Sequence, residues 1–84
     1  MHFVYIVECK DTSLYTGYTN DLDKRVYTHN HGKTGAKYTR ARRPVVLRYS
    51  ERFRSHRKAL RREAELKKLT RQQKLHLIRF GNGL

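Results

Sequence analysis

The chain has 84 residues, with 20 Lys and Arg against 7 Asp and Glu, and a formal net charge of +13. This length predicts one domain, residues 1–84, with a small core, and 37% hydrophobic residues are too many for a disordered chain. The longest uncharged apolar run, Phe3–Val7, is too short for a membrane span or a signal peptide, and the lone Cys9 favours a reducing, cytoplasmic setting.

The positive charge lies in the second part of the chain. Residues 1–32 hold three basic and four acidic side chains, whereas residues 33–84 hold 17 basic and three acidic ones. One surface of the fold should therefore be strongly positive, and such a field attracts polyanions. Nucleic acid is the first partner to consider. A membrane surface is less favoured, because the C-terminal helices carry apolar residues that suit a core. The remaining reading is a solvated basic surface without a ligand.

The first half of the chain predicts a β-hairpin followed by a helix. The aromatic and β-branched run Phe3–Val7 is typical of a buried central strand, and residues 10–13 have turn chemistry. Residues 14–19 then predict a second strand. Asn20 is placed to cap a helix from Asp21 to about Gly32, and a polar, basic loop without periodicity follows over residues 32–43.

The second half predicts one more strand and two helices. Pro44 opens a strand over residues 45–49, and Ser55 caps a helix that runs to about Leu69. Thr70 and Gln73 form a capping box for a last helix, which ends at Gly81-Asn82-Gly83. The order β-β-α-β-α-α predicts a compact α+β domain, in which helices flank a three-stranded antiparallel sheet.

Three tyrosines crowd the predicted hairpin: Tyr5, Tyr15 and Tyr18. Gly17 lies inside the second strand, where it weakens the sheet unless another group must approach closely. An even sum of cross-strand residue numbers puts Tyr5 and Tyr15 on the same face, whereas an odd sum separates them. Core packing, base stacking and proton transfer all remain open roles for these side chains.

Arg25 and His29 are one turn apart on the predicted first helix and line one edge of its buried stripe. An arginine at that edge can grip a phosphate, and a histidine can carry a proton or donate a hydrogen bond. The alternative is a surface arginine beside a partly buried histidine whose hydrogen bonds are satisfied within the protein.

Glu63 breaks the pattern of the second predicted helix. At 100° per residue it falls in the middle of an apolar arc made by Ala59, Leu60, Ala64 and Leu66. A carboxylate aimed at the core is costly unless it is paired or binds a metal. Two interpretations follow: a buried ion pair with a nearby arginine, or a ligand of a hard cation such as Mg²⁺.

In order and spacing, these residues resemble the GIY-YIG nuclease domain, and in particular the small stand-alone bacterial proteins built on it. The resemblance extends from Phe3 to about Leu69. It rests on the following matches: Phe3-Val4-Tyr5, Tyr15-Thr16-Gly17, Arg25, His29 and Glu63. Phe3 and Thr16 depart from the motif, in which Gly and Ile are usual at these positions.

The resemblance implies a metal-dependent endonuclease that hydrolyses phosphodiester bonds, in DNA before RNA. Glu63 would hold one Mg²⁺ or Mn²⁺, and Arg25 would neutralise charge on the phosphoryl oxygens. Tyr5 or Tyr15 would deprotonate or orient the attacking water, and His29 would hydrogen-bond a tyrosine or the phosphate. Contacts with nucleic acid that do not read its sequence are expected from Gly17, Tyr18, Lys37, Arg40, Arg42, Arg43, Arg57 and Arg61.

The alternative function is a non-catalytic, basic nucleic-acid-binding module that keeps the fold and its positive face. The module needs only the charge, whereas the enzyme needs Tyr5, Tyr15, Arg25 and Glu63 to converge on one patch. A protein-interaction or structural role is the third reading. We expect a monomer, with no small-molecule cofactor and no membrane partner.

Overall fold

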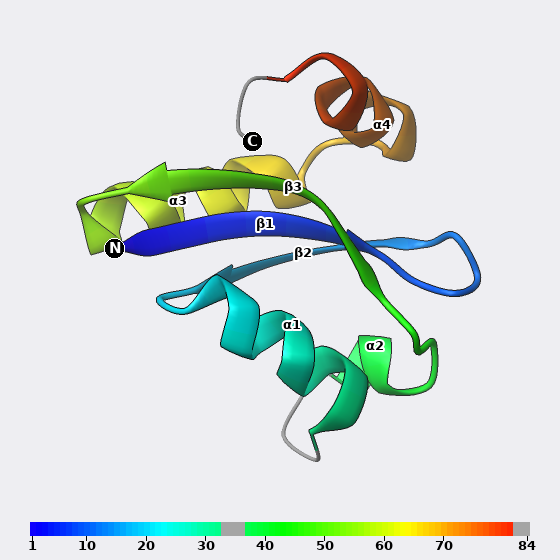
Figure 1. The fold of residues 1–84 in the computed structure, drawn as a ribbon. Helices are drawn as coiled ribbons and strands as arrows, with labels where there is room; N and C mark the ends of the chain where they lie inside the picture. Colours follow the sequence, from blue (N-terminus) through cyan, green and yellow to red (C-terminus); the bar gives the residue numbers. More distant parts are fainter. Residues whose placement is uncertain (33–36, 82–84) are drawn as a thin grey trace.

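The computed structural model describes residues 1–32 and 37–81. Residues 33–36 of the predicted basic loop, and Asn82 and Gly83 of the predicted helix end, lie outside the described residues. The elements follow in the order β1 (His2–Glu8), β2 (Leu14–Thr19), α1 (Leu22–His31), α2 (Lys37–Arg40), β3 (Val46–Phe53), α3 (His56–Lys67) and α4 (Arg71–Phe80) (Figure 1). The predicted α+β class is confirmed, with one short helix added.

The sheet has the order β2-β1-β3, and both strand pairs are antiparallel. The predicted central strand is confirmed, because the four residues from Val4 to Val7 are all buried. In the hairpin, Tyr5 pairs with Gly17 and Val7 pairs with Tyr15. The cross-strand sum is therefore even, and Tyr5 and Tyr15 lie on the same face of the sheet.

Helices cover both faces of the sheet (Figure 1). On one side lie α1 and α2. They cover a core cluster of Tyr5, Val7, Cys9 and Val45, against which Leu22 of α1 packs. On the other side lie α3 and α4. There Val4 packs with Ala59 and Leu66 of α3, and the cluster extends to Leu69 and to Leu77 of α4. None of the helices in the described ranges is long and apolar enough to cross a membrane.

Side-chain caps explain where the helices begin. Ser55 accepts a hydrogen bond from the backbone N–H of Lys58, and Thr70 and Gln73 form the reciprocal capping box, so both predicted starts are confirmed. The predicted cap of α1 was wrong by one residue. Asp21, rather than Asn20, accepts from the N–H of Lys24, and its charge also suits the positive end of the helix dipole.

Four other expectations were wrong, because the local pattern shows neither how far strands pair nor which helix faces are covered. The predicted loop contains α2, and β3 continues to Phe53 because it pairs along the whole of β1. On α3, Leu60 and Ala64 are exposed, so the predicted apolar arc is narrower. The expectation that α4 is committed to a core fails for Phe80, which is 63% exposed.

Candidate active site

Tyr5 is the centre of a polar cluster on the face of the sheet that α1 covers. Its ring lies across β2 at Gly17, where a Cβ atom would come within 2.6 Å of the Tyr5 Cζ. A real side chain cannot approach so closely, so Gly17 is required by the packing of Tyr5. This explains a glycine inside a strand, and it brings a hydroxyl from the central strand to the edge strand.

His29 lies beneath Tyr5 and has no exposed surface. Its Nε2 is 2.7 Å from the Tyr5 hydroxyl, and its Nδ1 is 2.8 Å from Oγ1 of Thr39 in α2. Burial, with added repulsion from Arg25 and Arg43, lowers the pKa of His29 to about 4. His29 is therefore a neutral residue with both ring nitrogens satisfied, and it cannot contact a phosphate directly from this position.

Arg25 joins the same cluster from α1. Its Nε donates to the Tyr5 hydroxyl at 3.4 Å, which is a long and weak hydrogen bond. Burial is the main cause that raises the pKa of Tyr5, and the nearby charges of Tyr15 and Glu63 add to it, while Arg25 acts in the opposite direction. Tyr5 is therefore un-ionised at neutral pH.

Tyr15 lies beside the cluster and is half-buried. Its ring meets the His29 ring edge to face, with centroids 5.4 Å apart, and stacks on Tyr38 of α2. No residue in the described part of the chain hydrogen-bonds the Tyr15 hydroxyl. Of the two motif tyrosines, Tyr15 is therefore the one whose hydroxyl is free to meet a ligand, while the Tyr5 hydroxyl is already held by protein groups.

Glu63 lies on α3, on the opposite side of the sheet from α1. It lies on the same stripe of α3 as Ala59 and Leu66, which are fully buried, and its side chain is only 19% exposed. The carboxylate pairs with Lys67 one turn later, at 3.2 Å, rather than with an arginine. Its charge contributes to the raised pKa of Tyr5, so it acts on the cluster. Among the described residues, however, no hydrogen bond links Glu63 to Tyr5 or Arg25.

Residues 1–76 match the GIY-YIG catalytic domain. The chain belongs to the GIY-YIG family. It is similar to a UPF0213 protein of Staphylococcus haemolyticus, with 62% identity over 92% of this chain and 93% of the relative. A UPF0213 protein of Clostridium perfringens is 60% identical over 93% of this chain and 83% of the relative. Membership of this family indicates a nuclease-type function, which suggests a nucleic-acid substrate.

Solved structures show the same fold. The solution NMR structure of the UPF0213 protein BH0048 from Bacillus halodurans matches with a TM-score of 0.62 and 50% identity, over 98% of this chain and 85% of that one. A protein from E. faecalis matches with the same TM-score and 41% identity, over 93% of this chain and 82% of that one. The three-stranded sheet flanked by helices is therefore the architecture of these relatives too.

GIY-YIG nucleases generally depend on a divalent metal, and a protein ligand for one in this domain would come from the carboxylate of Glu63, whose side chain is 19% exposed. Among the described residues there is no cluster of three or more His, Cys, Asp or Glu side chains, so the chain offers one carboxylate rather than a closed cage. One carboxylate completed by water and substrate phosphate suits Mg²⁺. The competing pair with Lys67 is partly solvated, because the Lys67 side chain is 52% exposed.

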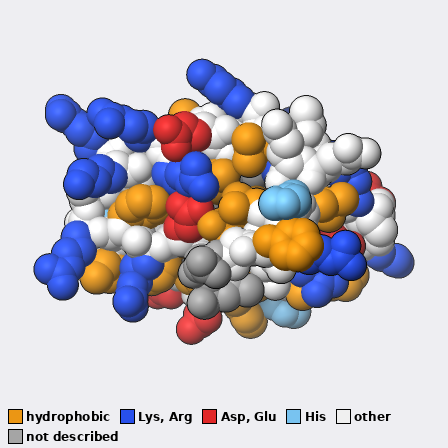
Figure 2. Space-filling model, turned by 90° about the horizontal axis from the view of Figure 1, so that it is seen from above, with side chains coloured by type: hydrophobic (Ala, Val, Ile, Leu, Met, Phe, Trp, Pro, Cys, Tyr) orange, Lys and Arg blue, Asp and Glu red, His pale blue; other side chains and the backbone are white. Residues whose placement is uncertain are grey.

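Some basic residues of the GIY-YIG domain make contacts within the protein, and others are exposed. Arg43 donates to the backbone carbonyls of Thr28, His29 and Gly32 and thereby caps the end of α1, while Arg42 pairs with Asp11 and stacks on Tyr38. Both have structural contacts. Figure 2 shows Lys and Arg side chains gathered along one edge of the α3 and α4 side. Five exposed basic residues lie between the end of β3 and the middle of α3: Arg52, Arg54, Arg57, Lys58 and Arg61. Lys37 and Arg40 are exposed on α2.

Tyr18 lies apart from the Tyr5 cluster. It pairs with Val4, so it faces α3, and its hydroxyl is 2.7 Å from Nδ1 of His2. His56 at the start of α3 packs against both rings. The structure therefore places Tyr18 in an aromatic group at the basic end of α3.

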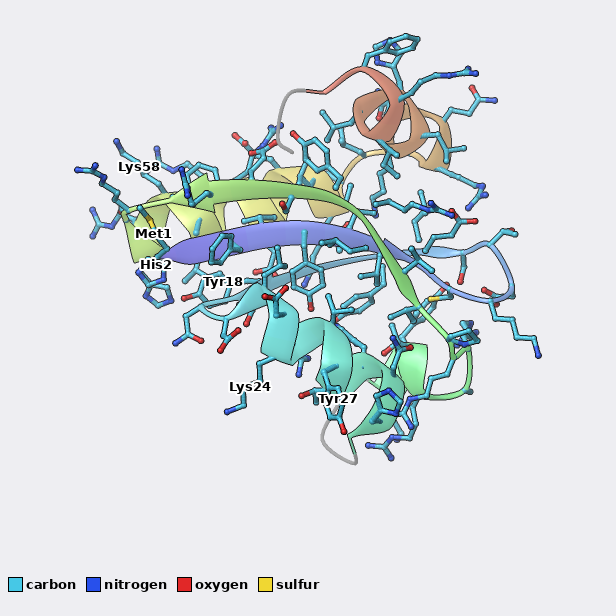
Figure 3. All side chains as sticks on the ribbon, in the orientation of Figure 1. Met1, His2, Tyr18, Lys24, Tyr27 and Lys58 are labelled. Carbon is cyan, nitrogen blue, oxygen red and sulfur yellow. The ribbon has the colours of Figure 1, made fainter. Side chains whose placement is uncertain are left out.

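Figure 3 shows Lys24 and Tyr27 on the outer side of α1, directed away from the sheet.

Thr39 is the site residue that sequence reasoning missed. It is buried and bonded to His29, yet it lies in a polar, basic segment with no periodicity to distinguish it. His2 and His56 were missed for the same reason, since only the fold brings them to Tyr18. A single hydroxyl or ring in such a segment carries no local signal that it will be buried.

Proposed function

We propose that this protein is a divalent-metal-dependent endonuclease that hydrolyses phosphodiester bonds in DNA. The observation that carries the proposal is the polar cluster of Tyr5, Arg25 and His29, which is built into the core beside Tyr15. Buried polar groups are costly, and a fold that needed only stability would place apolar side chains here. The electrostatic action of Glu63 on Tyr5 supports its contribution to the same site.

Arg25 is suited to bind the scissile phosphate. Its hydrogen bond to Tyr5 is long, so a phosphate can compete for the guanidinium, which then stabilises negative charge on the phosphoryl oxygens. When Arg25 turns to the phosphate, a lone pair on the Tyr5 oxygen becomes available to a water molecule. The hydroxyl of Tyr15, half-buried and without a partner among the described residues, hydrogen-bonds the substrate.

Tyr5 orients the attacking water and accepts its proton. Because Tyr5 is un-ionised, it must pass its own hydroxyl proton to Nε2 of His29 in the same step. After the bond breaks, His29 returns this proton to Tyr5, and Tyr5 releases the water-derived proton to the leaving oxygen through solvent. His29 is neutral above about pH 4, so Nε2 is available as the acceptor. Glu63 would hold Mg²⁺ or Mn²⁺, which supplies Lewis-acid stabilisation of the phosphate and the leaving oxygen.

The positive charge would hold the rest of the nucleic-acid backbone. Arg57 and Arg61 are exposed on α3, the helix that carries Glu63, and Lys37 and Arg40 are exposed on α2, the helix that carries Thr39 and Tyr38. Contacts of this kind neutralise phosphates and carry no sequence information, and their strength falls with salt. A cytoplasmic monomer is part of this proposal.

The test compares Glu63→Gln with Glu65→Gln. Glu65 is two residues away on the same helix, but its side chain is exposed and pairs with Arg62. Nicked, branched and single-stranded DNA and RNA are incubated with each protein in Mg²⁺ or Mn²⁺. We expect Glu63→Gln to lose at least about 100-fold in cleavage rate, and Glu65→Gln to remain close to wild type. Equal cleavage by both variants would contradict the proposal.

The second candidate is the non-catalytic nucleic-acid-binding module. Two observations favour it: Tyr5 is only 1% exposed, and Glu63 already has a partner in Lys67. Its signature would be binding that weakens steeply with salt, equal in wild type and Glu63→Gln, without cleavage of any of the substrates.

A further inference from the structure

The two ring nitrogens of His29 have different partners and cannot have the same role. Nε2 faces the Tyr5 hydroxyl at 2.7 Å, and Nδ1 faces Oγ1 of Thr39 at 2.8 Å. The ring is fully buried, and its low pKa keeps it neutral in neutral solution. A neutral imidazole has one N–H donor and one acceptor nitrogen, so one of the two hydrogen bonds is donated by His29 and the other is accepted.

The partners of Tyr5 decide which nitrogen is the acceptor. In the described part of the chain, the Tyr5 hydroxyl hydrogen-bonds only Arg25 and His29. A guanidinium has donors and no acceptor, so the hydroxyl proton of Tyr5 must be donated to Nε2 of His29. Nδ1 then carries the ring proton and donates it to Thr39. The opposite arrangement would leave the buried Tyr5 proton without an acceptor among the described residues, which is unfavourable for a buried donor.

We infer that Thr39 is a positioning residue: its hydroxyl oxygen holds His29 in the Nδ1–H tautomer and so aims the hydroxyl proton of Tyr5 at Nε2. The lone pairs of the Tyr5 oxygen are thereby left for Arg25 and for a water molecule. This role rests on the proposed function, in which Tyr5 receives the proton of the attacking water. The short helix α2 carries Thr39 and brings it against His29 of α1.

A purely structural role for Thr39 is the competing explanation. Valine has nearly the same shape as threonine, so Thr39→Val removes the oxygen and keeps the packing. Thr39→Ser keeps the oxygen and removes a methyl group. If Thr39 only fills space, serine is the worse replacement. If it selects the tautomer, valine is the worse replacement.

The experiment reads the tautomer directly, by ¹⁵N NMR of the histidine ring nitrogens in the full chain, with thermal unfolding to show that each variant is folded. We expect the Nδ1–H tautomer for His29 in wild type and in Thr39→Ser, and a shift toward Nε2–H in Thr39→Val. For cleavage, we expect Thr39→Val to lower kcat by roughly 10- to 100-fold, the usual loss when an outer partner that orients a histidine is removed. KM should stay unchanged and Thr39→Ser should restore kcat.

Each outcome decides a separate point. An Nε2–H tautomer in wild type, or the same tautomer in Thr39→Val as in wild type, overturns the inference about Thr39 whatever the activity. Tautomer control by Thr39 in a protein that cleaves none of the substrates overturns the proposed function alone. If Thr39→Val does not fold, Thr39→Ala with the same spectra takes its place, and an unchanged tautomer in that variant again overturns the inference.

Discussion

The two faces of the sheet differ in what their cores contain. On the α3 and α4 side the buried residues that pack together are aliphatic: Val4, Ala59 and Leu66. On the α1 and α2 side the core includes the hydroxyls of Tyr5 and Thr39 and the imidazole of His29, joined by hydrogen bonds. Both faces bury polar groups, but on the α1 and α2 side they bond one another in a chain through His29, whereas on the other side Tyr49 bonds Glu51 and the buried Oγ1 of Thr16 has no partner among the described residues.

The contrast extends to how substitutions should act. In the aliphatic cluster of Val4, Ala59 and Leu66, a truncation should cost free energy of unfolding and leave the chemistry of the folded molecules alone. In the polar cluster around His29, the effects should depend on pH and on hydrogen-bonding capacity. Glu63 is the link between the faces, because it lies on the stripe of α3 that packs on the sheet and its charge also acts on Tyr5.

The largest expected effect on stability is at Leu66. Leu66→Ala should lower the free energy of unfolding by about 3 kcal/mol, because it leaves a cavity between α3 and the sheet. Urea unfolding measures this loss. Leu60→Ala is the matched control on the same helix: Leu60 is 41% exposed, so the cost should stay below about 1 kcal/mol. Equal losses at the two positions would contradict the assignment of the α3 core face.

The next effect is a dependence of stability on pH that comes from His29. Its pKa is about 4 in the folded chain and about 6.5 when unfolded, so between these values the unfolded chain binds more protons. The free energy of unfolding should be highest above pH 6.5 and should fall by about 2 to 3 kcal/mol as the pH drops toward 4. Chemical denaturation between pH 7 and 5 tests the upper part of this window, where carboxylates contribute little.

Two variants isolate the His29 contribution. His29→Gln removes the titrating group and should flatten the dependence between pH 7 and 5. His31→Gln, on the exposed side of the same helix, should keep the slope of the wild type. A wild-type slope in His29→Gln would mean that another group is responsible.

The smallest effect is expected at Thr16, which faces α3. Its Oγ1 is buried and has no hydrogen-bond partner among the described residues. Thr16→Val keeps the shape and removes this polar atom, so it should raise the free energy of unfolding by about 1 kcal/mol. Thr19→Val, on the same strand, should lower it by a similar amount, since Thr19 bonds the backbone N–H and C=O of Asp21. A loss of stability in Thr16→Val would show that the hydroxyl has a favourable contact.

Much of the candidate site could be recognised before the fold was known. Tyr5, Tyr15, Arg25, His29 and Glu63 stood out by residue type and spacing, and Glu63 also because it broke the apolar pattern of its helix. Their arrangement could not be predicted. Whether Tyr5 and Tyr15 share a face depends on the hairpin register, and the turn sequence left both an even and an odd sum possible.

What the amino-acid sequence determined by itself is local: the central strand, the caps at Ser55 and Thr70, and the excess of positive charge in the second part of the chain. These features depend on neighbouring residues, so short-range chemistry is sufficient for them. The tertiary structure alone decided that Thr39 supports His29 and that Arg43 caps α1. Such contacts depend on how strands align and helices pack, because hydrogen bonds and ion pairs form only within about 3 to 4 Å.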